Sequence, residues 1–208
     1  MLLDADDSQL VLIDYQARLM PVIFENEMVV ANALRLARMA RLMDVPVWGT
    51  AQNPDKLGQN VPELQAAIDS AGGKTMAKMH FSAASDGLVE WLRPPVRKPA
   101  QGGNARSLPK HMQKPPESQQ DEGRSMIVIA GCEAHVCLMQ TALELLEEEF
   151  DVWVVTDACS SRSERNRDAA FDRLAGAGAE LVTTEMVAFE WARTCEHLAF
   201  RDLLALIK

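Results

Sequence analysis

Short apolar runs alternate with longer amphipathic segments along this chain. The clearest run, 126–130, passes through Gly131 into a segment with apolar residues at helical spacing. The runs that are short and apolar enough to form buried β-strands are 9–14, 44–50, 74–78, 126–130, 152–156 and 180–183. The segments with helical composition are 27–43, 62–71, 87–92, 135–149, 164–177 and 196–207.

This alternation predicts an α/β fold. We expect a doubly wound, mostly parallel six-stranded sheet with helices on both faces, in a Rossmann-like arrangement of three layers. In such sheets, ligands bind outside the carboxyl ends of the strands, so residues that follow strands should gather along one edge. The residues that follow strands here include Asp14, Thr50, Lys78, 131–137 and 157–161.

One segment interrupts the pattern. Residues 93–124 contain six of the ten prolines and show no apolar periodicity. We interpret them as a Pro/Gly-rich polar insert within a single domain that spans residues 1–208. Because the insert precedes the fourth strand, we expect it to lie at the end of the sheet opposite the ligand-binding edge.

Charge and cysteine content narrow the classes of partner. The net charge of −9 repels phosphate backbones, so we expect a small-molecule substrate rather than nucleic acid. No apolar run approaches the roughly 18 residues that span a bilayer, so no membrane partner is expected. The acidic N-terminus is unlike a targeting peptide, and four cysteines without a secretory signal indicate reduced thiols and a cytoplasmic location. The segment 27–43 is apolar enough that we expect a homo-oligomer, a dimer or larger.

Three residues at the predicted edge are candidates for covalent chemistry. Cys137 lies at the start of a helix, where backbone N–H groups and the helix dipole favour the thiolate. Asp14 could accept a proton from the thiol, and Lys78 would lower the pKa of the thiol. Each also has an ordinary interpretation, as a buried small residue, a capping carboxylate and a surface lysine. Their convergence favours covalent catalysis with Cys137 as the nucleophile.

The stretches that carry these residues resemble the isochorismatase-like cysteine hydrolases. They are Asp14-Tyr15-Gln16, Lys78 to Ser82, Gly131 to Cys137 with Thr141-Ala142 one turn on, and Val155 to Arg162. The C-terminal residues 200–208 resemble the ending of the isochorismatase-domain-containing subgroup. The resemblance covers nearly the whole chain except 93–124, and the turn that ends in Cys137 is its most specific part.

The resemblance implies roles for individual residues. Cys137 attacks a carbonyl-like carbon, Asp14 accepts and returns the proton, and Lys78 stabilises charge between them. The resemblance also implies a cis peptide bond between Cys132 and Glu133. That bond would turn the backbone N–H of Glu133 toward the substrate, where it would form an oxyanion hole with the N–H of Cys137. No cofactor is implied.

No metal site is predicted. Metal-dependent nicotinamidases carry an Asp-x-His cluster after the second strand, whereas residues 49–54 of this chain contain no histidine. Nicotinamide is therefore a weaker substrate candidate. Zinc binding by Cys132, His135 and Cys137 would lack a fourth ligand and the usual Cys-x-x-Cys pairs.

Five further side chains are candidates for binding the substrate: Gln16, Gln52, His80, Phe81 and His135. The glutamines could hydrogen-bond a substrate amide, or they could hold turns. The histidines could line the site, or they could be structural residues with satisfied hydrogen bonds.

The sequence therefore predicts a cysteine hydrolase of a small molecule that cleaves a C–N bond, such as an amide, through a thioester-type intermediate. Two alternatives remain open. One is a non-catalytic member of the same fold that works through assembly or binding. The other is a thiol redox protein that uses Cys137 with Cys132.

Overall fold

The computed structural model describes residues 1–94 and 123–208 and is built around one sheet. Six strands lie in the order β3-β2-β1-β4-β5-β6, and every pairing between them is parallel. The strands are β1 (Ser8–Ile13), β2 (Val47–Gln52), β3 (Lys74–Lys78), β4 (Met126–Gly131), β5 (Asp151–Val155) and β6 (Glu180–Val182). The predicted α/β fold with a doubly wound sheet is confirmed.

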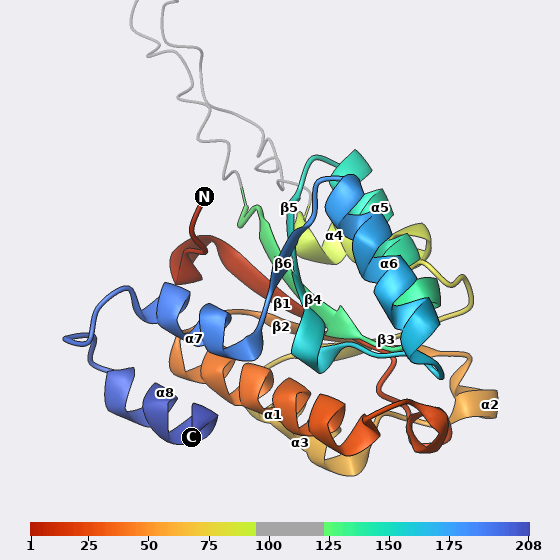
Figure 1. Ribbon diagram of the computed structural model, residues 1–208, viewed down its shortest axis with the longest axis horizontal. Helices are drawn as coiled ribbons and strands as arrows, with labels where there is room; N and C mark the ends of the chain where they lie inside the picture. Colours follow the sequence, from red (N-terminus) through yellow and green to blue (C-terminus); the bar gives the residue numbers. More distant parts are fainter. Residues whose placement is uncertain (95–122) are drawn as a thin grey trace, which may run out of the picture.

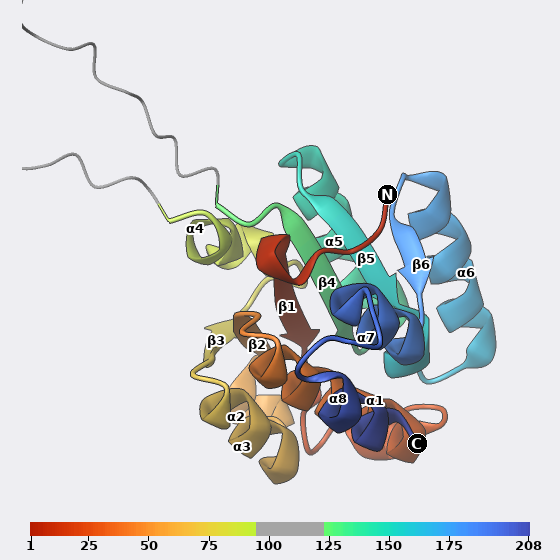
Figure 2. The ribbon, with the colours of Figure 1, turned by 90° about the vertical axis from the view of Figure 1, so that its left-hand side faces the viewer.

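Helices cover both faces of the sheet (Figures 1 and 2). One face carries α1 (Asn26–Leu42), α3 (Pro62–Ser70), α7 (Thr184–Ala192) and α8 (Phe200–Ile207). The other face carries α4 (Leu88–Leu92), α5 (Met139–Glu147) and α6 (Glu164–Gly176). A short helix, α2 (Pro54–Leu57), follows β2. The described residues also form four 3-10 turns and one π-helical turn: Ala5–Asp7, Met20–Val22, Ala84–Asp86 and Thr156–Ala158, and Ala134–Leu138.

The two central strands, β1 and β4, are buried along their whole length. Strands covered on both faces need nearly continuous apolar runs, and Gln9 is an exception. Its Nε2 donates to the carbonyl oxygens of Leu92 at 2.9 Å and Arg124 at 3.0 Å. Its Oε1 accepts from the indole N–H of Trp48 at 2.9 Å. Both the nitrogen and the oxygen of the buried amide therefore form hydrogen bonds, which link the start of β1 to α4 and to the segment before β4.

The helix α7 has no counterpart among the elements predicted from the sequence, and it lies between the sixth strand and the C-terminal helix. The hydroxyl of Thr183 caps this helix by accepting from the N–H of Met186 at 3.3 Å. Trp191 is buried, and its indole N–H donates to the hydroxyl of Ser8 at 3.0 Å. Apolar residues lie all around α7 rather than along one stripe, so the helical pattern is hard to see in the sequence.

The C-terminal helix is shorter than predicted. It begins at Phe200 rather than at residue 196, because a turn occupies the chain before it. That turn is closed by the N–H of Phe200, which donates to the carbonyl of His197 at 2.9 Å.

Most of the predicted insert, 95–122, lies outside the described residues. Its expected position relative to the ligand-binding edge therefore stays a prediction. None of the helices in the described ranges is long and apolar enough to cross a membrane.

Candidate active site

The candidate site lies where the sheet changes its winding direction. β1 connects through α1 on one face, and β4 connects through α5 on the other, while the two strands are hydrogen-bonded neighbours. The carboxyl ends of two such strands border a crevice in which doubly wound proteins bind ligands. Asp14 follows β1 directly, and the turn that contains Cys137 follows β4.

Gly131 lets this turn approach β1 closely. A Cβ atom at this position would overlap the carbonyl oxygen of Ile13. The same carbonyl accepts a hydrogen bond from the N–H of Cys132 at 3.0 Å. Only glycine permits the approach, and it brings the turn that contains Cys137 against the end of β1.

Asp14 is completely buried and adopts a left-handed backbone conformation with φ of 53°. Its Oδ1 accepts a hydrogen bond from the hydroxyl of Thr50 on β2 at 2.7 Å. Its Oδ2 lies 2.8 Å from the ammonium nitrogen of Lys78. Within the described residues, Oδ2 has no hydrogen-bond partner besides this ion pair with Lys78.

Lys78 reaches the site from the end of β3, across β2. The residue is only 2% exposed. Its Nζ donates to Oε1 of Gln52 at 2.7 Å and to the carbonyl of Phe81 at 2.9 Å, with the carbonyl of His80 at 3.3 Å. An ammonium buried this deeply needs such partners, and they hold it beside Asp14.

Cys137 lies in a π-helical turn, Ala134–Leu138, ahead of α5. It is 6% exposed, and both Asp14 and Lys78 act on its thiol. Burial and the negative charge of Asp14 raise the pKa of Cys137 to about 12, although Lys78 opposes the shift. Lys78 lowers the pKa of this thiol, as expected, but burial raises the pKa by more.

The backbone before Cys137 has the conformation that the family resemblance implies. The Cys132–Glu133 peptide bond is cis, as expected. The N–H of Ala134 donates to the carbonyl of Ser160 at 2.8 Å, which anchors the turn to the loop after β5. The expected oxyanion hole from the N–H groups of Glu133 and Cys137 stays a prediction.

The two candidate glutamines hold the site together. Gln16 is fully buried, its Nε2 donates to the carbonyls of Gln52 and Gly58, and its Oε1 accepts from the N–H of Gln52 at 2.9 Å. The side chain of Gln52 spans from Lys78 to the carbonyl of Met79, to which it donates at 2.8 Å. The structure therefore favours the turn-holding interpretation of Gln16 over substrate binding. Gln52 orients the lysine.

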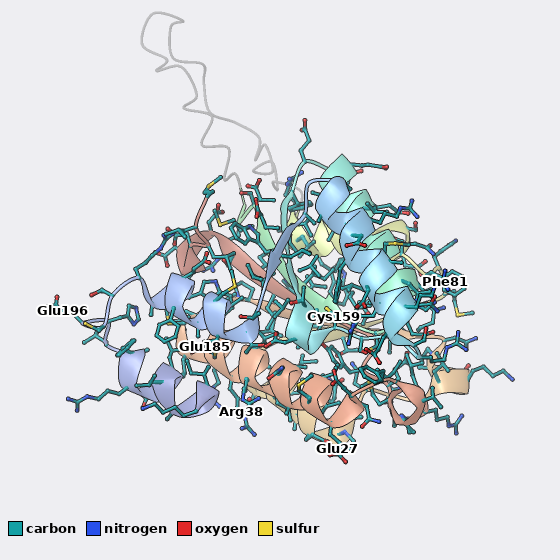
Figure 3. All side chains as sticks on the ribbon, viewed as in Figure 1. Glu27, Arg38, Phe81, Cys159, Glu185 and Glu196 are labelled. Atoms are coloured by element: carbon teal, nitrogen blue, oxygen red, sulfur yellow. The ribbon has the colours of Figure 1, made fainter. Side chains whose placement is uncertain are left out.

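The other three candidates lie toward the solvent. His80 has a side chain that is 68% exposed and pairs with Asp86 at 2.7 Å. Phe81 is 53% exposed and lies at the edge of the molecule in Figure 3. His135 is half-buried, and its Nδ1 lies 2.9 Å from the hydroxyl of Ser161. Of the three, His135 belongs to the turn of Cys137 itself, whereas His80 is occupied by its carboxylate partner.

Thr50 is predicted to lie at this edge, but the sequence alone gives it no role. It is completely buried and is the hydrogen-bond donor to Asp14. The sequence places Thr50 at the end of a strand, but its contact with Asp14 depends on the register of the two strands, in which Leu12 pairs with Gly49.

All four cysteines are free thiols in the structure. Cys132 and Cys159 are buried, and burial raises the pKa of Cys132 to about 12. Cys159 lies among the packed side chains at the centre of Figure 3, whereas Cys195 is exposed. In the part of the chain that the structure describes, no group of three or more His, Cys, Asp and Glu side chains is placed to hold a metal ion.

Known proteins resemble this chain along nearly its whole length. Residues 114–186 match the model of the isochorismatase domain. Isochorismatase domain-containing protein 2 of Rattus norvegicus is 32% identical over 203 residues, which cover 98% of this chain and 82% of that protein. The structure of MAR1 ribonuclease from Caenorhabditis elegans is 28% identical with a TM-score of 0.78, covering 100% of this chain and 92% of that one. The YcaC gene product of Escherichia coli is described as an octameric hydrolase of unknown specificity. It is 27% identical with a TM-score of 0.75, and the match covers 99% of this chain and 95% of that one.

Proposed function

The chain belongs to the isochorismatase family, and on that premise we propose that it hydrolyses a C–N bond of a small molecule, with Cys137 as the nucleophile. One observation carries the proposal. Oδ2 of Asp14, the Lys78 ammonium 2.8 Å from it and the thiol of Cys137 lie together beyond the carboxyl ends of β1 and β4. A nucleophile, a base and a fixed positive charge are the groups that covalent hydrolysis needs.

Each proton transfer in the proposed cycle uses Asp14. As Sγ of Cys137 adds to the carbonyl carbon, the carboxylate of Asp14 accepts the thiol proton. When the C–N bond breaks, Asp14 gives this proton to the leaving nitrogen, and a thioester remains. Water then adds to the thioester and returns a proton to Asp14, which passes it to sulfur as the C–S bond breaks. The ammonium group of Lys78 offsets the negative charge that moves between sulfur and carboxylate.

The raised pKa of Cys137 supports Asp14 as the base. With a pKa of about 12, the resting nucleophile is a neutral thiol. A neutral thiol must lose its proton during the attack, and Asp14 lies beside it to accept that proton. A nucleophile that was already ionised would leave the buried carboxylate without a role in the first step.

The surroundings favour a small substrate with an apolar part. Met79 and Phe81, directly after Lys78, are 66% and 53% exposed. Large apolar side chains in water beside a catalytic crevice can bury apolar atoms of a ligand. We therefore place an amide with an apolar substituent first among candidate substrates.

The C. elegans relative is named as a ribonuclease, but ribonuclease activity is a weaker proposal for this chain. The net charge of −9 repels an RNA backbone at every distance that salt does not screen. The groups at the crevice are a thiol and a carboxylate paired with one lysine, rather than a set of exposed cations that would hold phosphates.

A screen of small amides would test the proposal. We expect wild-type protein to release amine from at least one member, and Cys137→Ser, Asp14→Asn and Lys78→Met each to lose on the order of 10³-fold or more in kcat/KM. Cys195→Ser makes the same sulfur-to-oxygen change at an exposed position and should keep wild-type turnover.

Two results would contradict this function. One is wild-type turnover by Cys137→Ser on a substrate that the screen finds. The other is consumption of peroxide together with a Cys132–Cys137 disulfide detected by mass spectrometry, which would support the redox alternative instead.

A further inference from the structure

The outer side of α1 carries charged and apolar side chains that the subunit leaves uncovered. Glu27 and Arg38 are exposed, and Ala31 and Leu34 are half-buried. In Figure 3, Glu27 and Arg38 point away from the sheet at the edge of the molecule, toward the two ends of α1. The helices α3 and α8 both pack against α1, so the three form one continuous helical surface (Figures 1 and 2).

Two grooves follow α1 on this surface. The first, of about 700 Å³, lies near the start of the helix, and its lining includes Met20, Glu27, Val30, Leu34, Val61 and Glu63. The second, of about 620 Å³, lies near the end of the helix, and its lining includes Arg38, Arg41, Glu63, Ala67, Asp202 and Leu206. The first groove is thus apolar with acidic side chains. In the second, the charges that α1 itself contributes are basic, and the acidic ones come from α3 and α8.

The outward positions of α1 are self-complementary. Glu27, Ala31, Leu34 and Arg38 are separated by four, three and four residues, so they lie along one side of the helix and their spacing reads the same in both directions. If a second copy of the helix lies antiparallel, Glu27 faces Arg38 and Ala31 faces Leu34, twice each. Opposite charges then meet at both ends, and a large side chain meets a small one in the middle.

We propose that this surface binds a second copy of the chain across a two-fold axis, with α1 antiparallel to α1 of its partner and the axis passing between Ala31 and Leu34. A two-fold contact requires a surface that complements itself, and the pattern of α1 meets that requirement. The apolar lining of the grooves supplies the area, and the charges set the orientation.

The charges are available for such a contact. None of the ion pairs in residues 1–94 and 123–208 involves Glu27, Arg38 or Arg41. The chain as a whole carries −9, so two copies repel each other unless positive and negative patches meet. The basic end of α1 offers positive charge where it would face the acidic end of the partner helix.

Charge reversal tests both the surface and the orientation. Glu27→Lys alone places a lysine opposite Arg38 at both ends, and Arg38→Glu alone places a glutamate opposite Glu27. Each single variant should weaken self-association by about tenfold, measured by sedimentation or by light scattering of a dilution series. In an equal mixture of the two variants, the mixed dimer brings one lysine against one glutamate at one end and restores attraction there, while the other end keeps Glu27 opposite Arg38. Association should therefore return in the mixture, and the double variant Glu27→Lys, Arg38→Glu should associate like the wild type.

Matched reversals on the opposite face are the control. Glu147→Lys on α5 and Arg173→Glu on α6 change the same charges at exposed positions and should leave the mass unchanged. Circular dichroism checks that each variant is folded. A wild-type protein that stays monomeric at micromolar concentration would overturn the proposal, as would single variants that associate normally or a mixture that does not regain association.

Discussion

The two carboxylate oxygens of Asp14 have different surroundings. Oδ1 accepts from the hydroxyl of Thr50 at 2.7 Å, whereas Oδ2 faces Lys78 at 2.8 Å. Asp14, Lys78 and Cys137 are predictable from the sequence because each follows a strand of a parallel sheet. The hydrogen bond from Thr50 to Asp14 cannot be predicted in this way, because it depends on how far β2 is shifted along β1. The protonation state of the thiol escapes prediction for a related reason, since burial cannot be read from position along the chain.

Replacing Thr50 with valine tests whether the hydroxyl positions the carboxylate. The two side chains have nearly the same shape, so Thr50→Val leaves Oδ1 of Asp14 without its donor and little else changed. We expect kcat to fall by about 10- to 100-fold and the free energy of unfolding to fall by about 1–3 kcal/mol.

Thr50→Ser is the matched variant, because it keeps the hydroxyl and should restore kcat. If Thr50→Val loses stability but keeps the kcat of the wild type, the hydroxyl is only structural.

Alkylation of Cys137 by iodoacetamide reports the pKa of its thiol. Because that pKa is raised to about 12, the rate should rise across the range from about pH 7 to pH 10 without levelling off. The negative charge of Asp14 raises the pKa and the positive charge of Lys78 lowers it. Asp14→Asn should therefore react faster than wild type at one pH, and Lys78→Met should react slower. Mass spectrometry of the peptide that contains Cys137 measures each rate, and a plateau near neutral pH would show that the thiolate predominates at rest.

At the scale of elements, periodicity identifies the strands and the long helices, and local contacts explain the errors. The strands β1 and β4 are short apolar runs because helices cover both of their faces. The helix α7 escapes prediction because it is apolar all around, which gives no stripe to detect. Gln16 is a candidate for substrate binding by sequence, but its amide holds the backbone of Gln52 and Gly58. A polar side chain near a site is equally suited to either task, and only its neighbours decide.

The turn between β4 and the π-helical segment depends on Gly131, and Gly131→Ala tests that dependence. A Cβ atom there would overlap the carbonyl of Ile13, so β1 and β4 must separate at their carboxyl ends. We expect the free energy of unfolding to fall by about 1–3 kcal/mol, and the alkylation rate of Cys137 to change because the turn moves relative to Asp14.

Gly176→Ala in α6 is the control, since nothing lies within 4 Å of its added Cβ. That variant should gain up to about 1 kcal/mol in urea denaturation. Equal stability of the two variants would show that the close approach is not needed.

For the whole molecule, the order of the strands explains how one subunit presents two separate surfaces. The carboxyl ends of the strands hold the candidate active site, and α1 with α3 and α8 forms the outer surface on one side of the sheet. The alternation of strands and helices is enough to predict the sheet and the edge that carries the chemistry. The alternation does not tell which side of a helix contacts a partner. Apolar residues on a helix predict burial, but they do not show whether the core or a partner covers them.

Buried ionisable groups make the stability of the whole fold sensitive to alkaline pH. Burial raises the pKa of Tyr15, Cys132, Cys137 and Cys159 above the ordinary values of tyrosine and cysteine. Above about pH 9, thiols of the unfolded chain lose their protons while the folded protein keeps them, so the folded state binds more protons and loses stability as pH rises. At pH 10, each buried thiol should lower the free energy of unfolding by about 2 kcal/mol. Urea denaturation under reducing conditions at pH 7, 8, 9 and 10 measures this loss. Cys159→Ala removes one buried thiol and should lose about 2 kcal/mol less than wild type between about pH 8 and pH 10. An identical loss in both proteins would show that Cys159 ionises equally readily in the folded state, against the burial seen in the structure.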